Sequence, residues 1–285
     1  MAFLEVEFVS KSFSESGGKS LCVFKDVRLH IEKGEFVAMV GHSGCGKSTL
    51  LNIIAGLEQP TDGAVILDGR EIAGPGLDRM VVFQNFSLLP WSSVYENIRL
   101  AVKAAYSRWD RDKIHDYVQR YIDMVGLTGA EHKKPAALSG GMRQRVGLAR
   151  AFAVQPKVLL LDEPFAQIDA LTRGSIQEEL LRMWMATRNT VFMMTHDVEE
   201  AIFLSDKIAL MTSGPEARLA EITEVNFPRP RVHEQLAELP EYNRIRKNIM
   251  QFLKNCAPEI STDSKPKGEG ALVVRQEASA ELRST

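Results

Sequence analysis

The chain has 285 residues, 45% of them hydrophobic and 25% charged, which is the composition of an ordinary globular protein. Its 35 basic and 37 acidic residues leave a net charge of −2, which disfavours a protein that binds nucleic acid mainly through charge. Apolar runs stay far below the roughly 20 residues of a membrane-spanning helix, and the acidic N-terminus does not resemble a secretory signal. Cys22, Cys45 and Cys256 lie far apart, so a reduced, cytosolic protein is expected.

The predicted elements of the first 90 residues are mostly strands. Strands are expected at 3–9, 22–31, 36–40, 64–67 and 79–84, and one helix at 47–55. The run 36–40 is wholly apolar, which indicates a strand buried on both faces. A glycine-rich turn at 41–46 joins it to the helix, and this order of strand, turn and helix begins a parallel α/β unit.

Helices and strands then alternate along the chain. Helices are expected within 93–127 and at 141–154, 170–187 and 197–204, with strands at 158–161, 190–195 and 206–212. This alternation predicts a parallel sheet with helices packed on it.

The chain changes character near 226–231, where two prolines follow a strand. A helical segment interrupted at Pro240 is expected to run to about residue 255. Residues 257–285 contain no aromatic residue and few aliphatic ones, so they are predicted to form a disordered tail. A tail that binds a regulator is the alternative.

The glycine-rich turn carries the first functional motif. Residues 41–48 read Gly-His-Ser-Gly-Cys-Gly-Lys-Ser and fit the pattern G-x-x-x-x-G-K-[ST]. Its glycines let successive backbone N–H groups point at phosphate oxygens, and the following helix adds its positive end. Lys47 is expected to reach the β- and γ-phosphates and Ser48 to bind Mg²⁺. The predicted ATP-binding residues here are Gly41, His42, Ser43, Gly44, Cys45, Gly46, Lys47, Ser48 and Thr49.

Two carboxylates follow the apolar strand 158–161. Ligands of open α/β sheets bind at the carboxyl ends of strands, which is where Asp162 and Glu163 stand. Asp162 is expected to hold Mg²⁺, and Glu163 to polarise the attacking water as a general base. His196 and Gln84 also follow strands, and on position alone a catalytic and a structural role are equally expected for each.

A second anion-binding motif identifies the family. Residues 138–145 read Leu-Ser-Gly-Gly-Met-Arg-Gln-Arg and open a helix shortly before Asp162. One bound nucleotide needs only one phosphate-binding loop, so the presence of a second anion-binding motif at 138–145 needs an explanation. This motif resembles the signature of ATP-binding-cassette ATPases, and the resemblance covers residues 1 to about 226. It implies a P-loop NTPase α/β core with a parallel sheet flanked by helices, an N-terminal antiparallel β subdomain, and a helical signature subdomain at about 90–155. A C-terminal helical extension at 227–256 would follow.

The resemblance implies further roles. Ser139, Gly140 and Gly141 would contact ATP held by a second cassette, and Asp169 would lie in the loop that crosses the dimer interface. Phe13 matches the aromatic residue that stacks on adenine, where tyrosine is commoner. Gln84 matches the loop glutamine that senses Mg²⁺, so the implied magnesium residues are Ser48, Gln84 and Asp162. His196 matches the switch histidine. The implied catalytic residues are therefore Glu163, His196 and Gln84.

The resemblance also suggests what the ATPase drives. The apolar stretch 85–91 after Gln84 fits either core or a docking patch, and the family pattern favours docking of a transmembrane permease subunit. The segments 88–91, 169–172, 211–215 and 227–231 are similar to the importers of nitrate, bicarbonate, taurine and alkyl sulfonates, and most to the nitrate and bicarbonate members. The expected protein lies on the cytoplasmic face of the plasma membrane. Its partners would be permease subunits, a second cassette (itself or a paralogue) and, indirectly, a substrate-binding protein, with no nucleic acid.

Several rival functions are disfavoured. Cassette ATPases that act on ribosomes or DNA usually fuse two cassettes or insert a long coiled coil, and exporter halves usually fuse a membrane domain; none of these is visible here. A module that binds ATP without turnover would not need both Glu163 and His196.

Overall fold

The computed structural model describes residues 2–14 and 20–256, which form two β-sheets and their covering helices. The strands are β1 Leu4–Ser14, β2 Ser20–Ile31, β3 Phe36–Val40, β4 Asp62–Leu67, β5 Arg70–Glu71, β6 Arg79–Val82, β7 Val158–Asp162, β8 Thr190–Thr195, β9 Lys207–Met211 and β10 Leu219–Glu224. One sheet has the order β2-β1-β4-β5 and is antiparallel. The other has the order β10-β9-β3-β8-β7-β6, and only its edge strand β10 is antiparallel.

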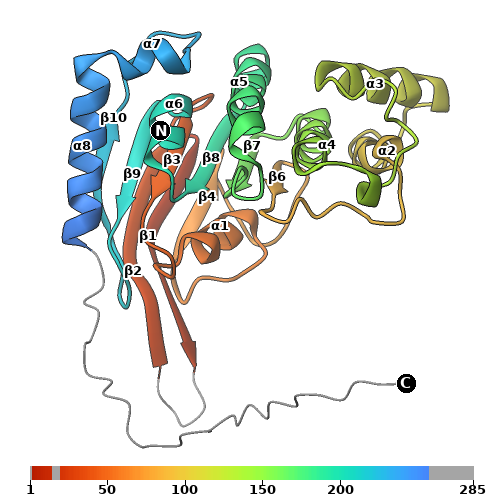
Figure 1. Cartoon of the computed structure of the whole chain (residues 1–285). Coiled ribbons are helices and arrows are strands. Elements are labelled where there is room, and N and C mark those ends of the chain that lie inside the picture. Colours follow the sequence, from red (N-terminus) through yellow and green to blue (C-terminus); the bar gives the residue numbers. More distant parts are fainter. Residues whose placement is uncertain (1, 15–19, 257–285) are drawn as a thin grey trace, which may run out of the picture.

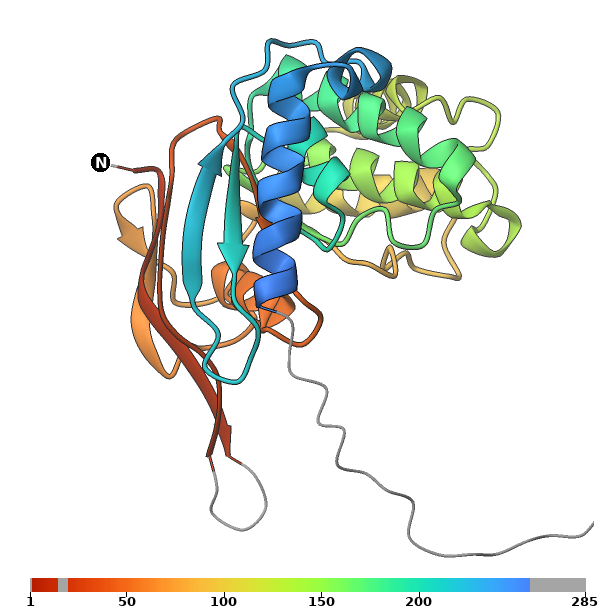
Figure 2. The ribbon, with the colours of Figure 1, turned by 60° about the vertical axis from the view of Figure 1, so that its left-hand side comes forward.

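The helices gather on two sides of the larger sheet. They are α1 Lys47–Ala55, α2 Val94–Ala105, α3 Arg111–Met124, the 3₁₀ turn η1 Pro135–Ala137, α4 Gly140–Ala153, α5 Ala170–Thr187, α6 Val198–Leu204, α7 His233–Ala237 and α8 Pro240–Asn255. Figure 1 shows α2, α3 and α4 together at one end of the molecule and α8 at the opposite end. The turned view in Figure 2 shows that α8 stands apart from these three helices.

The central strands are buried on both faces because they separate two cores. In β3, Phe36, Ala38 and Val40 face one core, whereas Val37 and Met39 face the other. The first core is shared with helices α2 to α6 and α8, and the second with α1 and the antiparallel sheet. Side chains on both faces of such a strand are buried in apolar surroundings, which explains the continuous apolar runs in the sequence.

Local signals in the sequence place most of the elements. The strands at 36–40 and 190–195 and the helices at 47–55 and 170–187 have the bounds predicted from the sequence. Helix α2 begins with a capping box in which Ser93 and Glu96 exchange side-chain and backbone hydrogen bonds. The expected interruption at Pro240 is the start of α8, where a proline costs no helical hydrogen bond. The predicted disordered tail at 257–285 lies outside the described residues.

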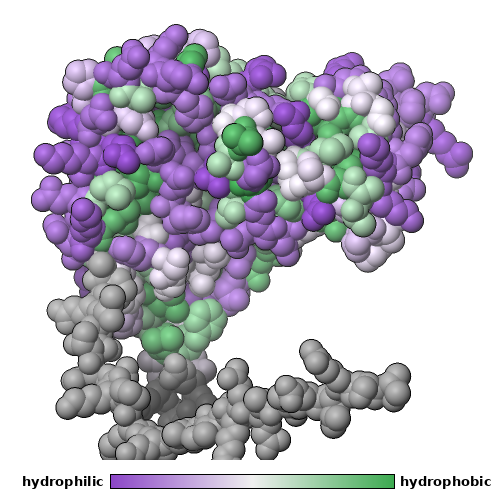
Figure 3. All heavy atoms as spheres, viewed as in Figure 1, coloured by the Kyte–Doolittle hydropathy of each residue, from purple (hydrophilic) through white to green (hydrophobic). Residues whose placement is uncertain are grey.

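Helix length and surface hydropathy bear on whether the described residues could cross a membrane. None of the helices within 2–14 and 20–256 is both long and apolar enough to cross a membrane. The face drawn in Figure 3 is mostly hydrophilic, with apolar patches in separate places.

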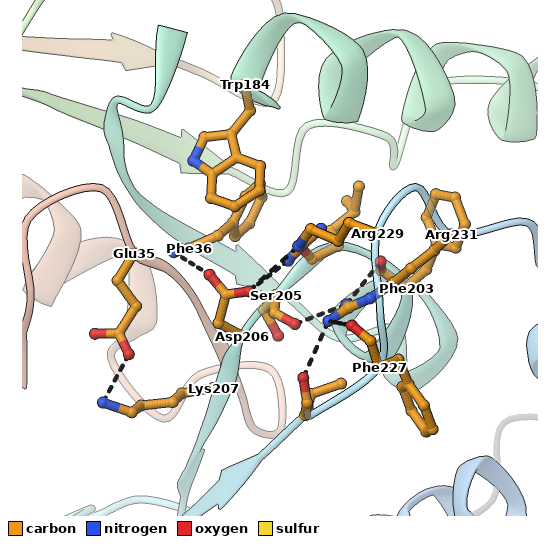
Figure 4. Close-up of polar contacts among 12 residues, drawn as sticks. Glu35, Phe36, Trp184, Phe203, Ser205, Asp206, Lys207, Phe227, Arg229 and Arg231 are labelled. Atoms are coloured by element: carbon orange, nitrogen blue, oxygen red, sulfur yellow. Dashed lines mark hydrogen bonds and ion pairs between the residues drawn. The ribbon is translucent and has the colours of Figure 1, made fainter. Parts of the chain in front are cut away.

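Two arginines join the segment that precedes α7 to the end of α6. Arg231 is buried, and its two terminal nitrogens donate to the carbonyls of Ile202, Phe203, Ser205, Val225 and Phe227. Figure 4 shows this guanidinium beside that of Arg229, which bonds to Asp206 and to Leu204 O. Several of these carbonyls end α6, where a helix lacks internal partners for its last C=O groups. The two positive charges therefore cap α6 and complement its dipole.

Candidate functional site

The glycine-rich turn forms a tight loop between β3 and α1. Gly44 and Gly46 have φ angles of 82° and 96°, in the left-handed region that glycine tolerates best. A Cβ atom at Gly46 would lie 2.6 Å from Val23 Cγ1 and 2.7 Å from Phe24 Cδ1, so strand β2 leaves no room for a side chain. Gly46 caps α1 through its backbone alone, which leaves the first N–H groups of the helix available to an anion.

Lys47 is held over this loop by its own backbone. Its ammonium donates to Gly41 O at 2.8 Å and to His42 O at 2.9 Å, and the residue is only 5% exposed. The buried positive charge is thus anchored within the loop that was predicted to bind phosphate. Cys45 next to it is also buried, and burial raises the pKa of its thiol.

The predicted magnesium residues from the loop and from β7 are adjacent. Ser48 Oγ donates to Asp162 Oδ1 at 3.0 Å, although 114 positions separate the two in the chain. Burial raises the pKa of Asp162, and the neighbouring Glu163 acts in the same direction. A bound cation would offset both effects, and hydroxyl and carboxylate oxygens are the ligands that Mg²⁺ takes. The residues present therefore fit a magnesium ion.

Glu163 sits at the centre of a cluster of three polar side chains. Gln84 Nε2 donates to Glu163 Oε2 at 3.3 Å, and His196 Nδ1 lies 3.4 Å from the same oxygen. Glu163 has a φ of 44°, which is uncommon for a residue other than glycine and costs backbone energy. Its N–H donates to Met194 O of the next strand, which holds this conformation in place. The turn directs the carboxylate toward the ends of β6 and β8.

The remaining predicted residues lie in other hydrogen-bond networks. Ser139 caps α4 by accepting from Met142 N, and Asp169 caps α5 by accepting from Thr172 N. A Cβ atom at Gly140 would lie 3.0 Å from Gln167 O, so the start of α4 borders the loop that precedes α5. A Cβ atom at Gly141 would lie 3.1 Å from Ile176 Cδ1. Phe13 is 42% exposed near the end of β1, where Lys11 lies 4.8 Å from its ring centre.

The sequence left open whether the stretch 85–91 is core or docking surface, and the structure divides it. Phe86 is buried, whereas Trp91 is 69% exposed. Beside this stretch lies a cleft of about 430 Å³, whose lining includes Leu57, Phe83, Leu100 and Arg150. The guanidinium of Arg150 supports the stretch by donating to Phe86 O and Ser87 O. Sequence reasoning missed Arg150 and this cleft, because its walls come from distant segments.

The arrangement matches a known family. Residues 24–166 match the profile of the family described as ABC transporter. The chain belongs to the ABC transporter family. It is an ATPase cassette of that family. One solved relative is the dimeric ATP-binding cassette MJ0796 with bound ADP and phosphate. It is 30% identical, with a TM-score of 0.70, and the match covers 79% of this chain and 100% of that one.

Curated relatives are similar over nearly the whole chain. The nitrate import ATP-binding protein NrtD of Synechococcus elongatus is 50% identical over 88% of this chain and 91% of its own length. The bicarbonate transport ATP-binding protein CmpD of the same species is 49% identical over 89% of this chain and 91% of its own. The protein CmpC, also for bicarbonate transport, is 51% identical, but the matched part is only 38% of its length.

Proposed function

We propose that this chain hydrolyses ATP to drive an importer of a small inorganic anion, nitrate or bicarbonate. The proposal rests chiefly on the convergence of Ser48, Asp162, Glu163, Gln84 and His196 beside the phosphate loop. ATP would lie with its phosphates in the loop 41–49 and its adenine on Phe13. The cassette would span residues 1–226, with the helical subdomain at about 90–155 and a helical extension at 227–256.

The side chains around Glu163 divide the work of hydrolysis. Glu163 accepts a proton from the attacking water. Such a general base increases the rate of hydrolysis by about 10²- to 10⁴-fold. His196 and Gln84 fix the direction of this carboxylate through the contacts of 3.4 and 3.3 Å. Lys47 leaves its loop carbonyls for the phosphate oxygens and stabilises their negative charge. Mg²⁺, when bound by Ser48, Asp162 and Gln84, supplies further positive charge at the phosphates.

A second cassette, from another copy or a paralogue, would complete the site. Ser139, Gly140 and Gly141 take part in no contact with the phosphate loop among those found in residues 2–14 and 20–256. A helix N-terminus such as that of α4 can bind an anion, and the similar cassette MJ0796 is described as dimeric. We therefore assign these three residues to ATP bound in the second cassette, and Asp169 to the loop between the two.

The cleft lined by Phe83, Ser87 and Leu100 would receive the transmembrane partner. The apolar walls of this cleft, and the exposed Trp91 farther along the stretch 85–91, suit a short helix of a permease subunit. Gln84 lies in the connecting segment, so movement at the cleft reaches Glu163 directly. The chain would then be peripheral on the cytoplasmic face of the plasma membrane, with a substrate-binding protein reached only through the permease.

Nitrate and bicarbonate are supported equally by the relatives, at 50% and 49% identity. Because the anion does not touch an ATPase subunit, uptake has to be measured in cells. Two strains of the source organism are compared, one with the wild-type chain and one with Glu163→Gln in its place. Uptake of labelled nitrate, bicarbonate and taurine is measured in both strains. Loss of nitrate or bicarbonate uptake alone in the variant is expected. Loss of taurine uptake alone would overturn the substrate assignment and favour the sulfonate importers.

The enzymatic step is tested on the purified protein. Phosphate release by Glu163→Gln should fall by about 10²- to 10⁴-fold relative to wild type, while ATP still binds. Equal rates for the two proteins would show that Glu163 is not the general base.

A further inference from the structure

Two carboxylates and one imidazole meet on the outer face of the antiparallel sheet. Glu5 and Glu7 of β1 and His30 of β2 have ligand atoms that all lie within 4.8 Å of one another. Both glutamates are partly buried, and His30 is exposed. Figure 2 shows these two strands (red) on the side of the molecule opposite helices α2 to α4. None of the residues predicted to bind ATP or Mg²⁺ belongs to this cluster.

The register of the two strands places the three side chains together. Glu5 and His30 are directly opposite each other in the pairing of β1 with β2. Side chains alternate between the two faces of a strand, so Glu7 lies on the same face as Glu5. Opposite and diagonal neighbours in a sheet are close enough for long side chains to meet. The backbone hydrogen bonds of two strands, and not a loop, therefore hold the cluster.

A β-bulge lies at Glu7. Between Val6 and Val9, β1 has one residue more than the facing part of β2. A Cβ atom at Gly63 of the neighbouring strand β4 would lie 2.5 Å from Glu7 O, so only glycine leaves room for the bulge there. Bulges change the direction of a side chain, and here Oε1 of Glu7 lies 2.5 Å from Nε2 of His30.

Glu5 is the unpaired member of the cluster. Among the hydrogen bonds and ion pairs of residues 2–14 and 20–256, the side chain of Glu7 bonds only to His30, and that of Glu5 has no partner. On its other side Glu5 is opposite Ile66 of β4, which offers no polar group. Arg28, on the same face of β2, stacks on an aromatic ring of β1 at 3.8 Å. Two close carboxylates repel each other, and a cation between them would remove this repulsion.

The donor atoms indicate the class of ion. Carboxylate oxygens together with an imidazole nitrogen are ligands of Zn²⁺ and other divalent transition metals, whereas Mg²⁺ and Ca²⁺ prefer oxygen alone. Ligand atoms bound to one zinc ion at about 2.0–2.2 Å lie roughly 3–4 Å apart. Small rotations of side chains whose ligand atoms already lie within 4.8 Å would reach that geometry. The ion would take the place of the proton between His30 Nε2 and Glu7 Oε1.

We propose that Glu5, Glu7 and His30 form a binding site for a divalent transition metal ion, which joins β1 to β2. The site is separate from the predicted magnesium site and does not depend on the proposed function. The three ligands come together only when the strands pair, so the ion binds the folded chain and stabilises it. Strand β1 also carries Phe13, the residue predicted to stack on adenine, so the ion would stiffen the strand that holds it.

Titration of the full chain with Zn²⁺ tests the site. The protein carries Cys22→Ser and Cys256→Ser to remove rival thiol ligands, is freed of metals with a chelator, and is kept in excess Mg²⁺. Calorimetry should show one zinc ion bound per chain. Glu5→Gln and His30→Gln should each lower the affinity at least about tenfold, because each removes a ligand. Absence of zinc binding in the unsubstituted cluster would overturn the proposal.

Glu5→Gln distinguishes a metal site from an ordinary ion pair, because it leaves the contact between His30 and Glu7 in place. Without zinc, this variant should melt at the temperature of the parent protein. With zinc at about a hundred times the dissociation constant, the melting temperature of the parent should rise by about 5–11 °C, and that of the variant by much less. Glu221→Gln is the matched control, because Glu221 is an exposed glutamate on β10 of the other sheet. Equal zinc affinities for Glu5→Gln and Glu221→Gln would refute the site.

Anomalous diffraction at the zinc absorption edge locates the ion in crystals of the full chain grown with Zn²⁺. A peak between Glu5, Glu7 and His30 is expected. A peak only beside Glu163 and His196 would overturn the proposal, because zinc would then occupy the nucleotide site. In that case Glu163→Gln, and not Glu5→Gln, would lower the affinity measured in the titration.

Discussion

Replacing Arg231 by alanine should loosen the segment that precedes α7 from the end of α6. The guanidinium donates to five carbonyls, four of them at 2.8 to 3.0 Å. Burial lowers its pKa to about 10, so it stays charged at neutral pH. Three of the carbonyls belong to the end of α6 or to the residue that follows it, where no helical N–H can replace the lost donor.

The magnitude follows from the number of groups left without a partner. A hydrogen bond to a charged group contributes about 1.5–3 kcal/mol, and the contributions of one guanidinium are not additive. Water entering the space left by the side chain would satisfy some carbonyls, so we expect a net loss of about 3–5 kcal/mol. For a chain of this size, each kcal/mol shifts the melting temperature by about 2–4 °C. The expected decrease is therefore about 6–20 °C.

Thermal denaturation followed by circular dichroism measures this decrease. Arg231→Lys keeps the charge but loses the planar fork, so it should fall between wild type and alanine. Arg244→Ala is the control and should leave the melting temperature unchanged, because among residues 2–14 and 20–256 Arg244 pairs only with Glu241, on the exposed face of α8. If Arg231→Ala melts within about 2 °C of that control, the hydrogen bonds of the buried arginine to the end of α6 do not stabilise the fold.

Three further results are expected. Burial raises the pKa of Glu200 to about 7, so the stability that protonated Glu200 contributes is complete below the ordinary glutamate pKa and is lost as the pH rises through about 7. Between pH 5 and pH 8, the free energy of unfolding of Glu200→Gln should therefore fall by up to about 3 kcal/mol less than that of wild type. Equal decreases for the two proteins would contradict this. Lys47→Ala should weaken ATP binding by about ten- to a hundredfold in calorimetry, and unchanged affinity would place the phosphates elsewhere. Trp91→Ala should reduce co-purification with the permease at least tenfold, an order-of-magnitude value for one buried aromatic anchor, and full recovery would remove Trp91 from the docking surface.

The sequence by itself determined the architecture of the core. The wholly apolar run at 36–40 and the glycine-rich turn after it leave few alternatives to a buried strand, a tight loop and a helix, and the observed bounds of β3 and α1 agree. The alternation of strands and helices likewise predicted a mainly parallel sheet, which is observed. These features are local, because hydrophobic period and turn residues act over a few positions.

Short or polar elements were missed, or were expected without bounds as the strand before the prolines at 226–231 was, because little in the local sequence marks them. Strand β5 has only two residues, Arg70 and Glu71, and exists because β4 offers an edge for pairing. Strand β10 is almost entirely exposed, so it lacks the apolar period of a buried strand, and its antiparallel pairing with β9 places it at the sheet edge.

Tertiary structure alone decided how the site is assembled. Sequence motifs named Ser48, Asp162 and Glu163, but the bond of 3.0 Å between Ser48 and Asp162 joins residues 114 positions apart. The approach of α8 to the phosphate loop, through His42 and Leu253, has no motif at all. Such contacts depend on how separate elements pack, and packing is set by the whole core and not by neighbours in the chain. Short motifs in the sequence therefore predict the residues of the nucleotide site, whereas the contact between that site and α8 is visible only in the tertiary structure.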